Sequence, residues 1–315
     1  MTSNLNNWLR VRYVFSLMVA GAILMPAMAR AQLKQPLLSE DNLKRVSGHV
    51  YVIEGFPNVA IVVGNRATLV VDTGLGERNG ATVMRAEQKL AKGPILYLTT
   101  THYHSEHTTG EQAFPAGTII VRDSAQQEEI NKGLTAAHIE VFKKVSAQNM
   151  DLLQNVKLRP PDVVFDRETK LDLGGVTARL FWVGPAHTKG DELTFVEEDS
   201  ILIPGDIVQK DIFPILGNPD ASIKGWLSNL DSVEALHPKF IVPDHGPAIV
   251  DASQIGTQRA YILALQARAM ELKKQGVSVD DAGKTVTEEL KAKHPDWPNP
   301  NNIAGEVARA YEQSQ

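Results

Sequence analysis

Strand-forming runs gather in two halves of this 315-residue chain, and this grouping limits the folds that the chain can adopt. In the first half, the runs His49–Ile53, Val59–Val63 and Ala67–Val71 are rich in Val and Ile, and turn-forming residues separate them at 55–58 and 64–66. This pattern predicts an antiparallel meander. Similar runs predict later strands at Ile95–Thr99, Thr118–Val121, Val176–Val183, Ser200–Ile203 and Phe240–Val242.

Helix-compatible segments lie between these strands. Helices are expected over Asn79–Lys92, within 124–158 and over Ile223–Leu236, and from about residue 251 the pattern is helical only. Because each sheet must bury an apolar face, the alternation predicts an α/β fold with two sheets packed face to face and helices outside. We divide the chain into a segment 1–31, a main domain 32–250 and a helical C-terminal region 251–315.

The first 31 residues differ in character from the rest. Arg10 and Arg12 precede an uncharged apolar run, Val14–Met25, and small residues at 27, 29 and 31 follow Pro26. These features are typical of a secretory signal peptide, cleaved here after Ala31, which would place the protein in the periplasm or outside the cell. The alternative is an uncleaved anchor, but a spanning helix needs about 20 apolar residues. We therefore expect no stable membrane insertion after cleavage.

Charge and cysteine content narrow the function classes. Segment 1–31 holds three of the basic residues and no acidic residue, so 29 basic and 37 acidic residues remain and their net charge is −8. This balance argues against nucleic acid or an anionic membrane as partner, and leaves a small-molecule substrate as the expectation. The chain has no cysteine, so any metal site must use His and carboxylate ligands.

The densest group of ligand-type side chains follows the strand predicted at Ile95–Thr99. Three of the nine histidines, His102, His104 and His107, fall within six residues together with Glu106. A spacing of two puts His102 and His104 on one side of an extended segment, whereas His107 joins them only if the chain turns. A solvated loop with chance histidines is the alternative. The density of the cluster and its place at a strand end favour a metal site.

Three more candidate ligands follow predicted strands. His187 lies in the segment Gly184–Asp191, Asp206 comes directly after Pro-Gly, and His245 follows Pro-Asp. Each has a structural interpretation when taken alone, because a His at a strand end is commonly hydrogen-bonded and an Asp after Gly commonly forms a turn. Their common placement at strand ends indicates that they converge.

Five motifs, in order, resemble those of the metallo-β-lactamase superfamily. They are Asp72-Thr73-Gly74, His102-x-His104-x-Glu106-His107, His187-Thr188-x-Gly190-Asp191, Gly205-Asp206 and His245-Gly246. The match extends over about 190 residues, from Val59 to His245. The resemblance implies a four-layer αβ/βα sandwich, here with a helical C-terminal extension, and metals at one edge between the two sheets.

The same resemblance implies a site for two metal ions. The ligands of the first metal would be His102, His104 and His187. The ligands of the second would be Glu106, His107 and His245. Asp206 would bridge the two metals, and Asp72 would orient ligand loops through hydrogen bonds. Two zinc ions per chain are expected, and the second site could also take iron or manganese because it has more oxygen ligands.

Two residues depart from the family pattern. Glu106 stands where the family has Asp, so the motif is HxHxEH instead of HxHxDH. Its side chain is one methylene longer, and its carboxylate must therefore fold back or shift the second metal. Asp244 precedes His245 where the family commonly has Gly, and this anion either holds a ligand His or faces solvent.

The region after the bridging position mixes features of several branches. A bridging Asp206 resembles the glyoxalase II, lactonase and phosphodiesterase branches, whereas the segment Leu216–Ala221 resembles a β-lactamase loop. In that loop Asn218 would help to bind the substrate carbonyl, although its Gly-Asn-Pro context equally fits a structural turn. Gln209 occupies the place of the family's carboxylate-binding Lys, and Lys210 is next to it.

These features predict an exported metal-dependent hydrolase that opens a small acyl substrate, a β-lactam or a lactone, by attack of a metal-bridging hydroxide. Its catalytic set would include Glu106, Asp206 and Asn218. The first alternative is a thioesterase resembling glyoxalase II, which Asp206 and the helical C-terminal region favour. The others are a phosphodiesterase and a metal-binding accessory protein without turnover, and Glu106 supports the latter.

Two further features bear on the entrance to such a site. The helical stretch within 124–158 could cover it, and Phe56 at a hairpin tip could touch substrate. Both also have plain packing interpretations. His49, His138, His237 and His294 belong to no motif, so no role is predicted for them.

Overall fold

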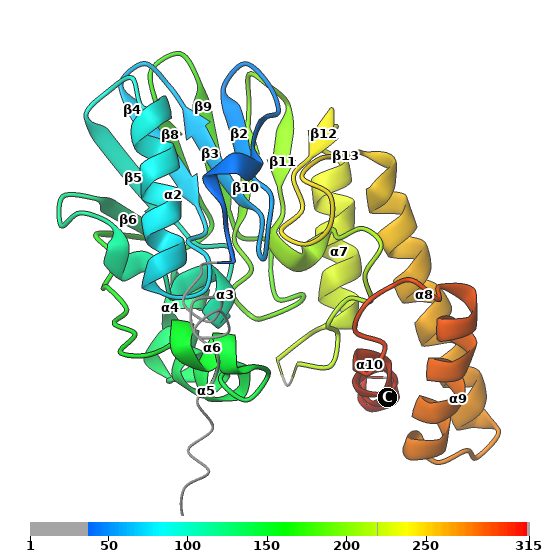
Figure 1. The fold of residues 1–315 in the computed structure, drawn as a ribbon. Coiled ribbons are helices and arrows are strands. Elements are labelled where there is room, and N and C mark those ends of the chain that lie inside the picture. Colours follow the sequence, from blue (N-terminus) through cyan, green and yellow to red (C-terminus); the bar gives the residue numbers. More distant parts are fainter. Residues whose placement is uncertain (1–36, 219, 314–315) are drawn as a thin grey trace, which may run out of the picture. The chain divides into compact units, whose positions relative to one another are not determined.

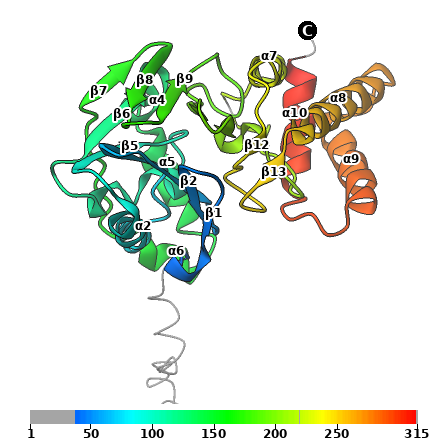
Figure 2. The same cartoon turned by 90° about the horizontal axis from the view of Figure 1, so that it is seen from above.

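Two β-sheets packed face to face form the centre of the structure (Figure 1). The computed structural model describes residues 37–313 except residue 219, so the signal peptide predicted at 1–31 lies outside the described residues. Helices cover the outer face of each sheet, and Figure 2 shows α2 and α8–α10 on opposite sides. The prediction of a layered α/β sandwich with C-terminal helices is confirmed.

The first sheet has seven strands in sequence order. They are β1 (Leu43–Arg45), β2 (Val50–Ile53), β3 (Val59–Val63), β4 (Ala67–Val71), β5 (Ile95–Thr99), β6 (Ile119–Asp123) and β7 (Val163–Phe165). Strands β2, β3 and β4 pair antiparallel, as the meander predicts. From β4 to β7 the pairing is parallel, so these strands end at the same edge of the sheet.

The second sheet has six strands in the order β13-β12-β11-β10-β9-β8. They are β8 (Glu168–Asp172), β9 (Thr177–Phe181), β10 (Leu193–Val196), β11 (Ile201–Ile203), β12 (Phe240–Ile241) and β13 (Val250–Asp251). Strands β11 and β12 are parallel and the other pairs are antiparallel. Consequently β9, β11 and β12 run in one direction. Strands β1, β7, β8, β10 and β13 were not predicted.

Strand β3 shows how the period of two builds the sandwich. Ala60 and Val62 point into the core between the two sheets, whereas Val59, Ile61 and Val63 point into the core beneath α2 (Glu77–Leu90). Successive side chains of a strand alternate between its faces, so a fully apolar strand serves two layers at once.

The remaining helices flank the sheets. Those that follow α2 in the first half are α3 (Ser105–Thr108), α4 (Ser124–Asn131), α5 (Leu134–Phe142) and α6 (Ala147–Leu152). Those of the second half are α7 (Ile223–Glu234), α8 (Ser253–Lys274), α9 (Val279–Lys293) and α10 (Asn302–Glu312). Short 3-10 turns are η1 (Glu40–Asn42), η2 (Glu111–Ala113) and η3 (Gly205–Ile207). The stretch expected to be helical within 124–158 is thus three short helices that end at Leu152, because Gly133 and Ser146 begin new ones.

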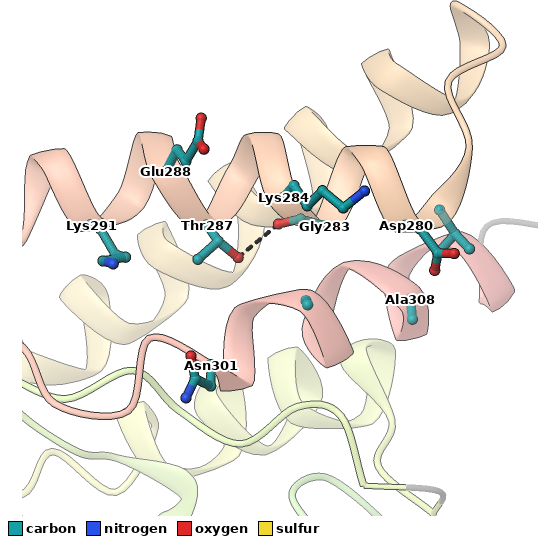
Figure 3. A pocket seen from close by; sticks show the side chains of 10 residues that line it. Asp280, Gly283, Lys284, Thr287, Glu288, Lys291, Asn301 and Ala308 are labelled. Carbon is teal, nitrogen blue, oxygen red and sulfur yellow. Dashed lines mark hydrogen bonds between the residues drawn. The ribbon is translucent and has the colours of Figure 1, made fainter.

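The C-terminal helices share one apolar core with the second sheet. Side chains of α7–α10 pack with those of β9–β13 in a single cluster, with Trp226 fully buried within it. A groove of about 620 Å³ lies between α9 and α10 (Figure 3), and none of its lining residues is a candidate ligand predicted from the sequence. Among the described residues, no helix is long and apolar enough to cross a membrane.

Candidate metal centre

The candidate ligands leave strand ends at one edge of the sandwich. His102 and His104 follow β5, His187 follows β9, Asp206 lies in η3 after β11, and His245 follows β12. The parallel course of β9, β11 and β12 brings three separate segments to this edge. All five side chains are buried, with exposed fractions of 6% or less.

A close backbone approach sets the position of Asp206. Gly205 has a φ of 59°, and a Cβ there would lie 2.8 Å from the Cβ of Thr101. Glycine alone permits both this conformation and this contact without strain. It therefore lets η3 approach the loop that carries the first two histidines.

The first group of ligand atoms comes from His102, His104, His187 and Asp206, whose ligand atoms all lie within 4.8 Å of one another. His187 Nε2 lies 3.3 Å from His104 Nδ1 and 3.4 Å from Asp206 Oδ2. His187 Nδ1 lies 3.0 Å from the carbonyl oxygen of Ile215 and can donate to it, which leaves Nε2 free to bind a cation.

The second group comes from Glu106, His107 and His245, again within 4.8 Å. Glu106 Oε1 lies 3.8 Å from His107 Nε2, and His245 Nε2 lies 3.3 Å from Asp206 Oδ1. Asp206 therefore turns one carboxylate oxygen toward each group. This is the geometry that a bridging ligand requires.

Unpaired buried atoms test whether cations fit these groups. Among the described residues, His102 Nε2, His107 Nε2 and both Asp206 carboxylate oxygens are buried without a hydrogen-bond partner. Buried polar atoms in proteins nearly always have a partner, so these atoms are available to bind a cation. Burial, together with the neighbouring imidazoles, lowers the pKa of His102 and His104 well below its usual value. Neutral imidazoles are the form that binds metal, so the residues present fit two divalent cations.

A buried network orients His107. Asp72, at a φ of 70° after β4, accepts a hydrogen bond from the Thr101 backbone at 2.8 Å, and its Oδ2 lies 3.1 Å from His107 Nδ1. Asp244 Oδ2 lies 3.4 Å from the same nitrogen and accepts from Thr101 Oγ1 at 3.0 Å. Asp244 is 1% exposed, so it holds a candidate ligand and does not face solvent.

The electrostatics of this network favour a cation. Burial opposes the charged form of His107, but Asp72, Glu106 and Asp244 outweigh it and raise its pKa to about 10. Burial and the charge of Asp72 raise the pKa of Asp244 well above its usual value. Both shifts have one origin, which is a concentration of buried carboxylates that a proton or a bound cation must balance.

Glu106 lies between two partners because of its length. Its Oε1 faces His107, while its Oε2 lies 3.7 Å from His138 Nδ1 and burial raises its pKa to about 7. His104, Glu106 and His138 could also be considered a metal-binding group. However, the rings of His104 and His138 stack with centroids 4.0 Å apart and planes 7° apart. Imidazole lone pairs lie in the ring plane, so two stacked rings cannot both point at one ion, and we assign Glu106 to the group with His107 and His245.

His138 is a site residue that sequence reasoning missed. The N-terminus of α3 has no side-chain cap of its own, and the backbone N–H of Ser105 donates to His138 Nδ1 at 3.1 Å. On the same face of α5, Thr135 donates to the carbonyl of Tyr103 at 2.8 Å. Helix α5 is therefore attached to the histidine loop at two points. A single His in a helical stretch gives no sequence signal for this contact.

Aromatic side chains form a rim beside the second group. The Phe56 ring lies 4.7 Å from the His245 ring and 6.4 Å from that of Phe142, which in turn lies 4.7 Å from His138. Phe56 is 40% exposed. The buried Asn58 of the same hairpin donates to the carbonyls of Pro243 and Gly246 and so fixes the loop of His245.

The side chains of Asn218 and Gln209, which the sequence places near a substrate, contact other parts of the protein. The Asn218 side-chain nitrogen donates to the carbonyl of His187 at 3.2 Å. Substrate binding by this amide would have to replace that hydrogen bond, and its catalytic role stays a prediction. Gln209 is buried, and its side chain lies near Asp206 and helps to lower the pKa of that carboxyl.

A sequence profile of the Metallo-beta-lactamase superfamily matches residues 52–245, which is more than half of the chain. The chain therefore belongs to the metallo-β-lactamase superfamily. The prediction of a hydrolase of this superfamily is thereby confirmed at the level of the family.

Solved structures agree with this fold. The sec-alkylsulfatase Pisa1 from Pseudomonas sp. is 16% identical with a TM-score of 0.65, and the match covers 86% of this chain and 50% of that one. The chain thus spans half the length of that alkylsulfatase. A metallo-β-lactamase from Pontibacter korlensis is 21% identical with a TM-score of 0.56, covering 72% of this chain and 99% of that one. The DIM-1 metallo-β-lactamase is 16% identical with a TM-score of 0.55, covering 73% and 98%.

Proposed function

We propose that this chain is a dinuclear metal-dependent hydrolase of a small acyl substrate, a lactone or a β-lactam ring. The observation that carries the proposal is the position of Asp206. Its two oxygens face two separate groups of buried ligand atoms, at 3.4 Å from His187 and 3.3 Å from His245. Two divalent cations bound there would lower the pKa of a water between them to roughly 7 and polarise a substrate carbonyl.

The chain's own residues hold and orient that chemistry. Although burial opposes it, the imidazoles of His245, His187 and His107 keep the pKa of Asp206 below its usual value, so this carboxylate stays ionised. Asp72 and Asp244 fix the ring of His107 from its far side. The ligand set is thus preorganised and needs little rearrangement during reaction.

A protein nucleophile is not supported. Ser105 Oγ lies 3.0 Å from His138 Nδ1 and 3.4 Å from Glu106. However, the ring nitrogen of His138 that lies nearest to the Glu106 carboxylate is also Nδ1. An imidazole relay needs the hydroxyl and the acid on opposite ring nitrogens, so Ser105, His138 and Glu106 do not form one.

Two observations support a preference for a lactone with an apolar group. The rim of Phe56 and Phe142 offers apolar surface beside His245. Gln209 stands where the family resemblance puts a carboxylate-binding Lys, and its side chain is turned to Asp206. The site therefore favours a lactone over a substrate that carries a carboxylate.

A panel of substrates tests the proposal on the zinc-loaded protein from residue 32 onward. It contains an acyl-homoserine lactone, a chromogenic cephalosporin, S-lactoylglutathione, a phosphodiester and a secondary alkyl sulfate, the last prompted by the alkylsulfatase fold. We expect turnover of the lactone, or of the lactone and the cephalosporin, and its loss in His104→Ala. Turnover of the thioester or the sulfate alone would contradict the proposal, as would full activity of His104→Ala.

We also propose export to the periplasm or the outside of the cell, on the character of segment 1–31. Expression of the full chain in a bacterium with separate analysis of its compartments tests this. A periplasmic or secreted product that begins at Gln32 is expected, and an uncleaved cytoplasmic product would contradict export.

A further inference from the structure

The loop that precedes α7 supports the first group of ligands. We call residues 215–218 and 220–222 the pre-α7 loop. The carbonyl of Ile215 lies 3.0 Å from His187 Nδ1, and the Asn218 side chain donates to the His187 carbonyl at 3.2 Å. The same loop therefore contacts both the ring and the backbone of His187. Any displacement of the loop changes the direction of His187 Nε2.

One face of α10 contacts the pre-α7 loop. Gly305 and Arg309 are four residues apart on α10, and Gln313, the C-cap residue, follows after four more, so the three positions lie on one side of the helix. Arg309 Nη2 donates to the carbonyl of Asn218 at 2.6 Å. The side chain of Gln313 donates to the carbonyl of Ala221 at 2.7 Å and accepts from the backbone of Ile223 at 2.9 Å.

A contact between two glycines brings the helix and the loop together. A Cβ on Gly217 would lie 3.1 Å from the carbonyl carbon of Gly305, which is tighter than normal side-chain contact. The absence of a side chain at Gly217 therefore lets the helix backbone approach the loop, whereas a Cβ on Gly305 would make ordinary contact at 3.5 Å. Arg309 and Gln313 then reach the carbonyls of Asn218 and Ala221, and the Asn218 carbonyl also accepts from the backbone of Ala221 at 3.0 Å.

We propose that α10 is a clamp on the pre-α7 loop, with Arg309 as a positioning residue that acts on His187 through the loop backbone. The part of this inference that concerns turnover rests on the proposed function, whereas the part that concerns His187 and metal retention does not. The C-terminal helices would then contribute to the metal centre although they supply no ligand.

The contacts by which α10 holds the pre-α7 loop differ from the contacts that pack α10 against the rest of the protein. The opposite contacts of the helix are apolar and buried, through Ile303, Val307 and Ala310. Tyr261 of α8 also donates to the buried Glu306 at 2.8 Å. These contacts hold α10 in place without Arg309. Removing the guanidinium should therefore release the loop while the helix stays packed.

Metal retention tests the clamp directly. Zinc affinity of the full mature chain is measured by competition with a chromophoric chelator in Arg309→Ala, Arg309→Lys and Gln313→Ala. Removal of groups that orient a metal ligand typically costs at least about tenfold in affinity. We expect about a tenfold loss for Arg309→Ala, partial recovery in Arg309→Lys because one N–H can still reach the Asn218 carbonyl, and a smaller loss for Gln313→Ala.

Arg268 provides the matched control. It is an arginine of α8 that pairs with Glu289 of α9 and contacts neither the loop nor α10 in these interactions. Arg268→Ala should leave zinc affinity unchanged, and amide hydrogen exchange over residues 215–218 should accelerate only in the Arg309 and Gln313 variants. Equal zinc affinity and equal exchange in Arg309→Ala and Arg268→Ala would overturn the clamp.

The two proposals fail separately. If no substrate of the panel is hydrolysed but Arg309→Ala loses zinc affinity and protection, the clamp stands and the proposed reaction is wrong. If hydrolysis is found but Arg309→Ala retains zinc and exchange protection, the proposed function stands without the clamp. Gln313 is exposed and follows the last helical residue, so its variant remains informative if Arg309→Ala does not fold.

Discussion

At the scale of single residues, the centre depends on which carboxylates carry charge. Asp72 and Asp244 both face His107 Nδ1, yet burial beside Asp72 raises the pKa of Asp244 well above its usual value. Burial and the neighbouring carboxylate of Asp72 therefore favour the neutral form of Asp244. The two residues look alike in the sequence and differ in role.

This difference gives a prediction for two matched variants. Asp72→Asn removes the carboxylate oxygen that lies 3.1 Å from His107 Nδ1, so we expect zinc affinity at the second site to fall by about 10- to 100-fold. Asp244→Asn keeps the shape of a side chain whose neutral form burial already favours, so the zinc affinity of this variant should stay within a few-fold of the wild type. Zinc titrations of both variants check this. A larger loss of zinc affinity in Asp244→Asn than in Asp72→Asn would contradict this difference between the two residues.

Residue-scale roles were predictable only where a motif carried them. His102, His104 and His107 stand out by density, and the resemblance added His187, His245 and Asp206. His138 could not be predicted, because its role arises from a contact between α5 and Ser105 that no local pattern encodes. Asp244 was noticed as a departure, but only its buried position shows which of its two interpretations holds.

At the scale of elements, short helices support the centre from outside. Helix α5 caps α3 through His138, and α10 contacts the loop behind His187. Neither helix supplies a ligand of the two assigned groups. Helix α3 is only four residues long, so it depends on such external partners more than a long helix would.

The cap on α3 can be measured as stability. His138→Ala leaves the Ser105 N–H without its acceptor, and loss of a helix cap costs about 1 kcal/mol. We expect a decrease of this size in the free energy of unfolding of the metal-free protein, measured by chemical denaturation. Glu140→Ala, an exposed position on the same helix, is the control. If the free energy of unfolding of His138→Ala were unchanged, His138 would not stabilise α3 as a cap.

The attachment of α10 to α8 predicts a pH dependence. Burial raises the pKa of Glu306 to about 8 from a usual 4.5, although the hydroxyl of Tyr261 opposes the shift. Because the pKa of Glu306 is higher in the folded protein than in the unfolded chain, its protonated carboxyl contributes fully to the free energy of unfolding below about pH 4.5. This contribution is lost as the pH rises toward about 8. In the Glu306→Gln variant, this decrease in stability with rising pH should be absent. Thermal unfolding of the metal-free protein across this pH range checks it, and parallel curves for wild type and variant would contradict it.

Strand boundaries were predicted best in three runs that are rich in Val, Ile and Leu. Strands β3, β4 and β5 match the predicted runs residue for residue. Strand β8 was missed because the sequence Glu-Thr-Lys-Leu-Asp lies at an edge of the second sheet and exposes every other residue. Pairing with β9 forms it, and that pairing is a tertiary contact.

At the scale of the whole molecule, the packing of the two sheets brings together strand ends that are distant in the sequence. Residues 85 positions apart, His102 and His187, meet because β5 and β9 belong to sheets packed on a common core. The layered fold followed from the alternation of strands and helices, whereas the order of strands within each sheet did not. Strand order depends on long-range pairing, which periodicity does not specify.

The central claim is a two-metal centre in which Asp206 is shared. Anomalous X-ray scattering at the zinc edge, on crystals of the zinc-loaded protein, tests it most directly. We predict two peaks roughly 3.5–4 Å apart, with Asp206 between them. One peak should lie within about 2.0–2.1 Å of His102, His104 and His187 nitrogens, and the other should contact Glu106, His107 and His245. A single peak, or a second peak held by His138 instead of His107 and His245, would contradict this assignment.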